Sequence, residues 1–117
     1  MKGDDLADRL VEFAVRVIAV VDSLPKSSAG KHIGGQLLRC GTSPGANYEE
    51  ARAAESKADF VHKLSIVHKE LQESRFWLKV ISRTKMLSGQ ELHKTIAEVE
   101  ELCRIVGKSL STARSRK

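Results

Sequence analysis

Two groups of polar residues have the types and spacing that could do chemistry. In the first, Asn47 and Glu50 lie one helical turn apart, and Arg39 precedes Asn47 by eight residues. On a continuous helix these three side chains fall on neighbouring faces. The second group, further along the chain, contains Lys63, Lys69, Glu70 and Glu73.

These groups allow two interpretations. A network of Arg, Asn, Glu and Lys side chains can hold two helices in register. Alternatively, Asn47, Glu50, Lys69 and Glu70 could serve a hydrolase or a metal enzyme. Structural networks of this kind are common and also perturb titration, which favours the first interpretation.

Basic residues form a second candidate site. They recur every four residues in two rows, and this spacing would place each row as a stripe along one face of a helix. Further basic residues follow at the C-terminal end of the chain. Phe76 and Trp77 lie beside the first row, and cations next to aromatic rings suit phosphate contact with base stacking. The alternative is a solvated charged face, with Trp77 in a core or subunit contact. The predicted nucleic-acid-binding residues are Arg75, Lys79, Arg83, Arg104, Lys108, Arg114, Arg116 and Lys117.

Motifs for catalysis or metal binding are largely missing from the sequence. The four histidines form no H-E-x-x-H pattern, and His62 and His68 are six residues apart, which puts them on different helix faces. Gly30-Lys31 lacks the glycine spacing of a phosphate-binding loop. Ser23 and Lys26 have Ser-x-x-Lys spacing, but Pro25 breaks the helix that this motif needs. We therefore expect no enzyme activity, no metal and no cofactor.

Length and composition indicate one globular domain. The chain has 117 residues, 41% hydrophobic and 30% charged, with a formal net charge of +5. The N-terminus is acidic where a signal peptide would be basic, and no apolar run reaches the roughly 18 residues that span a bilayer. These features predict a cytoplasmic protein without a membrane segment. Cys40 and Cys103 form no C-x-x-C pair and are expected to be buried thiols.

The elements that position these residues read as four helices, and the predicted fold is an all-α, antiparallel up-down four-helix bundle. The helices are expected at about 4–23, 28–55, 56–85 and from a capping box at Ser88 to about Leu110, with 111–117 as a basic tail. Ser27 or Ser28 and Ser56 are expected N-caps. Gly41, Ser43 and Pro44 favour a break in the second helix, and a kinked but continuous helix is the alternative.

Apolar residues at alternating four- and three-residue intervals predict the core of this bundle. The clearest seam, in the first helix, runs from Leu6 to Leu24. A second apolar stripe lies beside it on the same helix. So wide an apolar surface predicts cover on two sides, by the bundle itself or by another subunit. The stripe consists of Val11, Val15, Ile18 and Val21.

The central block resembles the signature of a known family. The run 36–51 reads QLLRCGTSPGANYEEA and contains the pattern Arg39, Ser43, Asn47, Glu50 and Ala51. A second block, DFVHKL at 59–64, is followed by the Lys-Glu and Trp-Leu pairs at 69–70 and 77–78. The combination resembles the bacterial four-helix-bundle proteins also called the 23S ribosomal RNA intervening-sequence protein family.

This resemblance implies properties that the spacing does not show. Members are small cytoplasmic bacterial bundles without established enzyme activity, and those of known structure form a five-fold ring. The family is similar to the accessory protein of diversity-generating retroelements, a basic pentamer that binds nucleic acid and a reverse transcriptase. We therefore expect a homo-oligomer, with five subunits, that binds nucleic acid, with RNA favoured, through electrostatic contacts. The alternative is an oligomeric scaffold for a protein partner that binds no nucleic acid.

Overall fold

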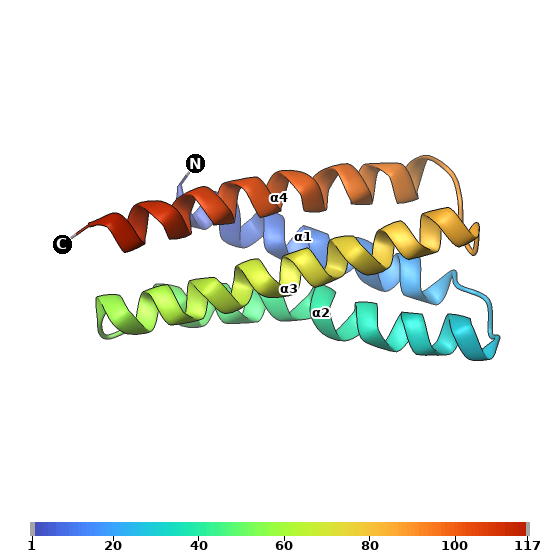
Figure 1. The fold of residues 1–117 in the computed structure, drawn as a ribbon, viewed down its shortest axis with the longest axis horizontal. Helices are drawn as coiled ribbons and strands as arrows, with labels where there is room; N and C mark the ends of the chain where they lie inside the picture. Colours follow the sequence, from blue (N-terminus) through green and yellow to red (C-terminus); the bar gives the residue numbers. More distant parts are fainter. Residues whose placement is uncertain (1, 117) are drawn as a thin grey trace.

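The computed structural model describes residues 2–116 and shows four helices in one antiparallel bundle. The helices are α1 (Gly3–Asp22), α2 (Ser28–Arg52), α3 (Lys57–Thr84) and α4 (Gln90–Ser115). Each runs opposite to its neighbours, and the bundle is a rod of 49 × 23 × 20 Å (Figure 1). Short connections favour this arrangement because they leave successive helices side by side. The predicted all-α up-down bundle is confirmed.

The core follows the predicted heptad seams. Leu10, Phe13 and Val17 of α1 are fully buried, as is Leu71 of α3. Burial of each such side chain contributes about 1.5–3 kcal/mol, which explains why this spacing dominates the fold. The thiols Cys40 and Cys103 are also buried and unpaired, as predicted. Thr95 and Leu102 of α4 are buried as well.

Two of the three predicted helix caps are present. The side chains of Ser27 and Ser56 each accept a hydrogen bond from the backbone N–H three residues later. The capping box predicted at Ser88 is wrong. The N-cap of α4 is Gly89, which has no side chain to cap with. Its φ of 114° lies in a region that glycine adopts readily, so the tight turn between α3 and α4 decides where α4 begins.

Helix α2 runs without interruption through Pro44, so the predicted break does not occur. A proline inside a helix removes one hydrogen bond and crowds the preceding turn, at a cost of about 3 kcal/mol. Here Pro44 is buried, and α2 packs closely on both α1 and α3. A Cβ built on Gly41 would lie 2.7 Å from both γ-carbons of Val17, so the α1–α2 packing requires glycine there. Tertiary packing therefore overrides the local break signal.

The second apolar stripe of α1 faces outward. Val11, Val15 and Ile18 are 55%, 54% and 44% exposed, so the bundle itself does not cover them. Only Val21, at the end of the stripe, is partly buried against the core. Helices α1 and α4 also make the least contact of the four neighbouring pairs. None of the helices within residues 2–116 is long and apolar enough to span a bilayer.

Candidate nucleic-acid interface

The polar residues of the central block meet along the seam between α2 and α3. Nη1 of Arg39 lies 3.1 Å from Oε2 of Glu70, and Nη2 of Arg39 donates to Glu73. Nε1 of Trp77 donates to the same Glu73 oxygen at 3.2 Å. The hydrogen bond from Arg39, aided by that from Trp77, holds the pKa of Glu73 below its usual range. Glu73 therefore acts as a charged acceptor that joins both helices.

A second contact crosses this seam further along. Nζ of Lys63 on α3 lies 2.8 Å from Oε1 of Glu50 on α2. Within α2, Nδ2 of Asn47 donates to Oγ of Ser43 at 2.8 Å and to the Ser43 carbonyl oxygen at 3.1 Å. Lys69 is exposed on α3. The predicted cluster is thus spread along two helices, and its charged members are mostly paired with each other.

This arrangement suits registration of α2 against α3 better than chemistry. Arg39 already meets two carboxylates, and Lys63 already meets one, so neither cation is left to bind a substrate group. Within residues 2–116, no group of three or more His, Cys, Asp or Glu side chains is placed to hold a metal ion. The geometry therefore directs attention to the basic residues.

The predicted basic residues on α3 and α4 do not form a single patch. Lys79 lies 3.8 Å from Glu100, and Arg104 lies 2.6 Å from Glu101, so α4 acids partly neutralise both. Arg83 lies near the α3–α4 connection, at the opposite end of the rod from the end of α4 (Figure 1). The others make no ion pair within residues 2–116; they are Arg75, Arg83, Lys108, Arg114 and Arg116.

The C-terminal basic residues extend the bundle itself. Helix α4 continues to Ser115, so residues 111–115 of the predicted tail are helical and Arg114 lies on α4. Arg116 follows directly, in extended backbone conformation. Lys117 lies outside the described residues. The helical extension places Arg114 at the end of the bundle where α3 begins (Figure 1).

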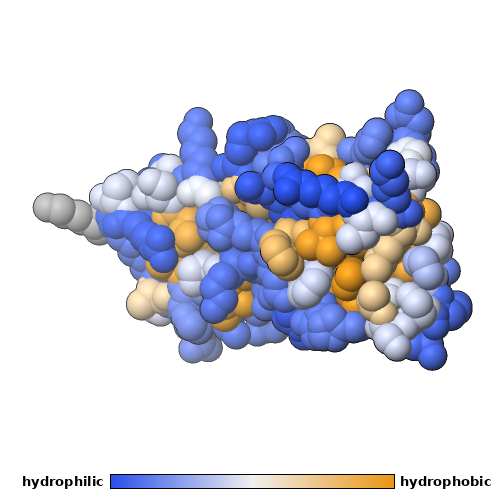
Figure 2. Space-filling view, turned by 45° about the vertical axis from the view of Figure 1, so that its right-hand side comes forward, coloured by the Kyte–Doolittle hydropathy of each residue, from blue (hydrophilic) through white to orange (hydrophobic). Residues whose placement is uncertain are grey.

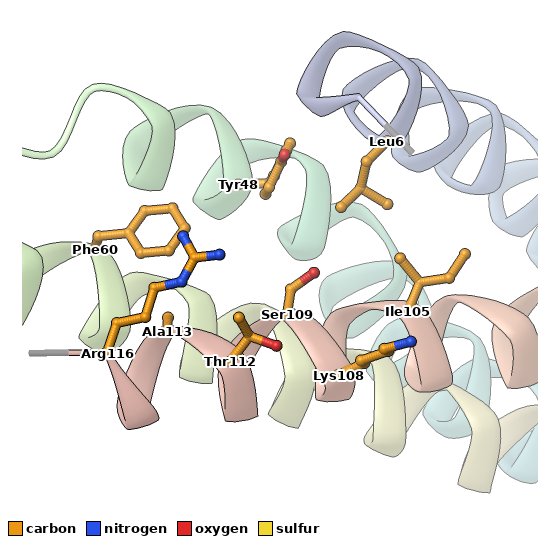
Figure 3. Close-up of a pocket in the computed structure, with 9 residues that line it drawn as sticks. All are labelled: Leu6, Tyr48, Phe60, Ile105, Lys108, Ser109, Thr112, Ala113 and Arg116. Carbon is orange, nitrogen blue, oxygen red and sulfur yellow. The ribbon is translucent and has the colours of Figure 1, made fainter.

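Two of these cations line an open pocket of about 510 Å³ at that end of the bundle. Lys108 lies on α4 and Arg116 directly follows this helix, and together with other α4 side chains they form one wall of the pocket. Phe60 of α3, Tyr48 of α2 and Leu6 of α1 face that wall from the other three helices (Figure 3). Burial raises the pKa of Tyr48, so its hydroxyl stays protonated. The pocket thus combines aromatic rings with two cations.

Sequence reasoning missed this pocket. Phe60 fits the α3 seam and was expected only as core, and Tyr48 was part of the polar run around Asn47. The two are brought together with Lys108 because the ends of all four helices meet there. One signal in the sequence could have indicated the pocket. Phe60 lies in the first turn of α3, so its side chain lies at the end of the bundle.

The two aromatic residues beside the basic row differ in environment. The Trp77 ring is half-buried and packs edge-to-face on His32 of α2, with centroids 6.0 Å apart. Phe76 is 56% exposed and packs edge-to-face on Trp77 at 4.9 Å. A shallow hollow beside Phe76 is lined by Lys79, Val80 and Arg83, among others. Figure 2 shows one face of the molecule, where hydrophobic side chains gather between long hydrophilic ones.

Comparison with known proteins settles the family. The sequence profile of the 23S rRNA-intervening sequence proteins matches residues 5–108, which include α2, α3 and most of α1 and α4. The chain belongs to this family. The match begins near the start of α1 and ends at Lys108, so most of α1–α4 is family sequence and the last basic residues follow it.

A solved structure supports both the family and the fold. It is the crystal structure of a protein of unknown function from the S23 ribosomal protein family of Bacteroides thetaiotaomicron. The two chains are 32% identical, the alignment covers 95% of this chain and 99% of the other, and the TM-score is 0.85. No curated protein matches the sequence.

Proposed function

We propose that this member of the 23S rRNA-intervening sequence protein family is a non-enzymatic, self-associating bundle that binds nucleic acid through exposed cations. RNA is the expected ligand and the cytoplasm the expected location. The likeness to the accessory protein of diversity-generating retroelements remains a prediction. The proposal has two parts, nucleic-acid binding and self-association, which rest on different surfaces.

One observation carries the nucleic-acid part. Arg75, Arg83, Lys108, Arg114 and Arg116 are exposed, and none of them has an ion-pair partner within residues 2–116. Side-chain carboxylates are paired with other cations elsewhere in the bundle, as in Arg39 with Glu70. Cations that no carboxylate neutralises are the groups that exchange counterions for phosphates when nucleic acid binds. Binding of this kind depends strongly on salt and weakly on sequence.

Self-association is supported by the outer face of α1. Val11, Val15 and Ile18 form an exposed apolar stripe along α1. Exposed Asp8 and Glu12 lie on the same helix. Apolar rows of this size on a surface mark contact sites for other proteins.

The charge on α1 favours a head-to-tail contact. If two copies joined through the same α1 face, Asp8 and Glu12 of one copy would approach those of the other and repel them. A contact with a different, basic surface of the next copy avoids this repulsion. Such contacts close into rings when the rotation between copies permits, and the expected ring has five subunits.

A second candidate function follows from Phe76. Its exposed ring, with Lys79 and Arg83 beside the same hollow, gives an apolar and basic surface that complements the apolar and acidic face of α1. If the next subunit covers this surface, Lys79 and Arg83 serve assembly and not nucleic acid. The protein would then be an oligomeric scaffold for a protein partner.

The test measures binding and mass together. A fluorescent structured RNA and a duplex DNA are titrated at about 50 mM and about 150 mM salt, where the affinity of a ligand held by several phosphates changes steeply. The triple variant Lys108→Gln/Arg114→Gln/Arg116→Gln removes three exposed cations at one end. The control Lys26→Gln/Lys31→Gln/Lys85→Gln removes three exposed cations elsewhere that also make no ion pair within residues 2–116.

We expect binding by a particle of several 12.9-kDa chains, weakened steeply by salt. The first triple variant should lose more affinity, and more of the salt dependence, than the control. Equal losses would show that only net charge matters and would overturn the residue assignment. An oligomer that ignores both nucleic acids at low salt would favour the scaffold.

A further inference from the structure

The pocket at the end of the bundle is larger than the basic hollow beside Phe76, which has a volume of about 290 Å³. Its volume of about 510 Å³ lies within the usual range for small-molecule sites, roughly 300–1,000 Å³. All four helices contribute to it, with Leu6, Tyr48 and Phe60 opposite the α4 wall (Figure 3). Because the walls belong to four packed helices, the site is formed before any ligand arrives.

Its lining separates into two chemical parts. Tyr48, Phe60 and Ile105 give ring and hydrocarbon surface. Lys108 and Arg116 give two positive charges, and none of the described residues that line the pocket is acidic. The side chain of Arg116 extends toward the Phe60 ring (Figure 3). The hydroxyls of Ser109 and Thr112 add hydrogen-bonding groups between the two parts.

We propose that this pocket binds one unpaired nucleotide. Its base stacks on the ring of Phe60, next to the buried Tyr48, and its phosphate contacts Arg116. Lys108, toward the other end of the pocket, meets an adjoining phosphate of the strand (Figure 3). A flat base suits aromatic surface, and an arginine binds phosphate through paired N–H groups. This proposal rests on the proposed function and deepens it, because it names the part of the nucleic acid that the protein reads.

Other ligand classes fit the lining less well. An inorganic phosphate would use the two cations and leave Phe60 and Tyr48 without a role. A neutral apolar ligand would use the rings and leave Lys108 and Arg116 facing empty solvent. A base paired within a duplex cannot enter, because its faces are covered by its neighbours in the stack. A nucleotide with an exposed base uses both parts of the lining.

Two sources could supply this nucleotide, a free nucleoside monophosphate or an unpaired position in a strand. The strand is favoured by Arg114, which is exposed close to Arg116 but outside the pocket, where it can meet a neighbouring phosphate. Competition separates the sources. If uridine monophosphate at millimolar concentration displaces a bound oligonucleotide, free nucleotides also enter the pocket. If it does not, the flanking phosphates supply the affinity.

The test uses the full chain and a fluorescent uridine-rich oligonucleotide of about eight nucleotides, both single-stranded and paired in a duplex. Phe60→Leu removes the flat ring while keeping apolar volume. Lys108→Gln and Arg116→Gln each remove one pocket cation, and Lys31→Gln, which removes an exposed cation outside the pocket, is the control. Because Lys108 and Arg116 are exposed, their variants keep the test valid even if Phe60→Leu fails to fold.

We expect Phe60→Leu to weaken single-strand binding about tenfold and to leave duplex binding unchanged. Lys108→Gln and Arg116→Gln should each weaken single-strand binding more than Lys31→Gln does. A strand that contains 5-bromouridine, irradiated in the complex and mapped by mass spectrometry, should cross-link to Tyr48 or Phe60.

Two results would overturn the pocket, and they are distinct from failure of the proposed function. Cross-links that map to Phe76 or Trp77, or a Phe60→Leu variant that folds and binds the single strand normally, would remove the pocket and leave nucleic-acid binding in place. If the wild-type protein binds neither strand nor duplex at low salt, both proposals fall together.

Discussion

The carboxylate of Glu98 on α4 accepts two hydrogen bonds from the guanidinium of Arg9 on α1. Nε of Arg9 lies 3.0 Å from Oε2, and Nη2 lies 2.7 Å from Oε1. The hydrogen bonds that Arg9 donates to Glu98 raise the pKa of Arg9. This bidentate contact joins α1 and α4, the two neighbouring helices that otherwise make the least contact. Both side chains are mostly buried, at 30% and 25% exposed.

Arg9→Gln should therefore destabilise the bundle measurably. Paired charged hydrogen bonds that are shielded from solvent contribute more than exposed ones, and we expect the free energy of unfolding to fall by about 1 kcal/mol. Arg104→Gln is the control, because Arg104 pairs with Glu101 within α4 and is 70% exposed. Urea unfolding of both variants measures the difference. A double variant of Arg9 and Glu98 that lost as much as both single changes combined would show that the two residues are not coupled.

Two glycines of α2 should respond in opposite directions to alanine. In Gly41→Ala, the new Cβ would meet the stiff side chain of Val17 at 2.7 Å, so overpacking should lower the free energy of unfolding by about 1–3 kcal/mol. In Gly35→Ala, the new Cβ meets nothing within 4 Å, and better helix propensity should raise stability by up to about 1 kcal/mol. Thermal unfolding of both variants checks the two signs. A gain in stability for Gly41→Ala would contradict the close packing of α1 and α2.

The buried Cys40 thiol should make the protein less stable in alkali. Burial raises the pKa of Cys40 to about 11. The unfolded chain loses the thiol proton near pH 8.5, so the folded state holds this proton more tightly. The free energy of unfolding should therefore be unaffected at neutral pH and should fall as the pH rises from about 9 toward 11.

Cys40→Ala isolates this contribution. Its free energy of unfolding should fall less steeply over the same pH range, because the titrating thiol is gone. Urea unfolding at several pH values gives both slopes. Parallel slopes for the variant and the wild type would show that the thiol titrates alike in the folded and unfolded chains. Slow reaction of the native thiol with a disulfide reagent, compared with the protein in urea, gives a second readout.

Polar substitution on the outer face of α1 should dissociate the expected oligomer without unfolding its subunits. Val11→Asn/Ile18→Asn replaces exposed side chains, so the free energy of unfolding at low concentration should change little. The mass in sedimentation or light scattering should fall toward one 12.9-kDa chain. Ala29→Asn/Ala58→Asn, at exposed positions elsewhere, should leave the mass unchanged. A wild-type protein that is already monomeric would refute self-association directly.

The bundle was largely predictable because its core repeats at a helical period. Leu10, Phe13 and Val17 follow one another at intervals of three and four residues, which places their side chains on one face of a helix. Burial of these side chains turns that face toward the core. Local signals were less reliable. Pro44 favoured a break, but its burial between two helices keeps α2 continuous. Ser88 fitted a capping box, but Gly89 takes the cap because the preceding turn sets the backbone.

The candidate site was predictable only in part. Helical spacing identified Lys108 as part of a basic stripe, and the excess of basic residues at the C-terminal end identified Arg116; both are exposed. Their position opposite Phe60 and Tyr48 depends on how the ends of four helices meet, which no local pattern encodes. The polar cluster shows the same limit. Arg39 and Glu73 are 34 residues apart, and only the antiparallel register of α2 and α3 brings them into contact.

The two sides of α1 leave very different room for sequence change. Toward α2, contact runs through glycines such as Gly41 and Gly45, and even a methyl group at Gly41 would meet Val17. Toward α4, contact is sparse, and the hollow there is lined by Val15, Ala19 and Leu87, among others. New side chains, and with them new binding specificities, can therefore accumulate along the α1–α4 side while the α1–α2 side stays nearly fixed. The sequence of α1 can thus diverge on the side that faces α4 but not on the side that faces α2.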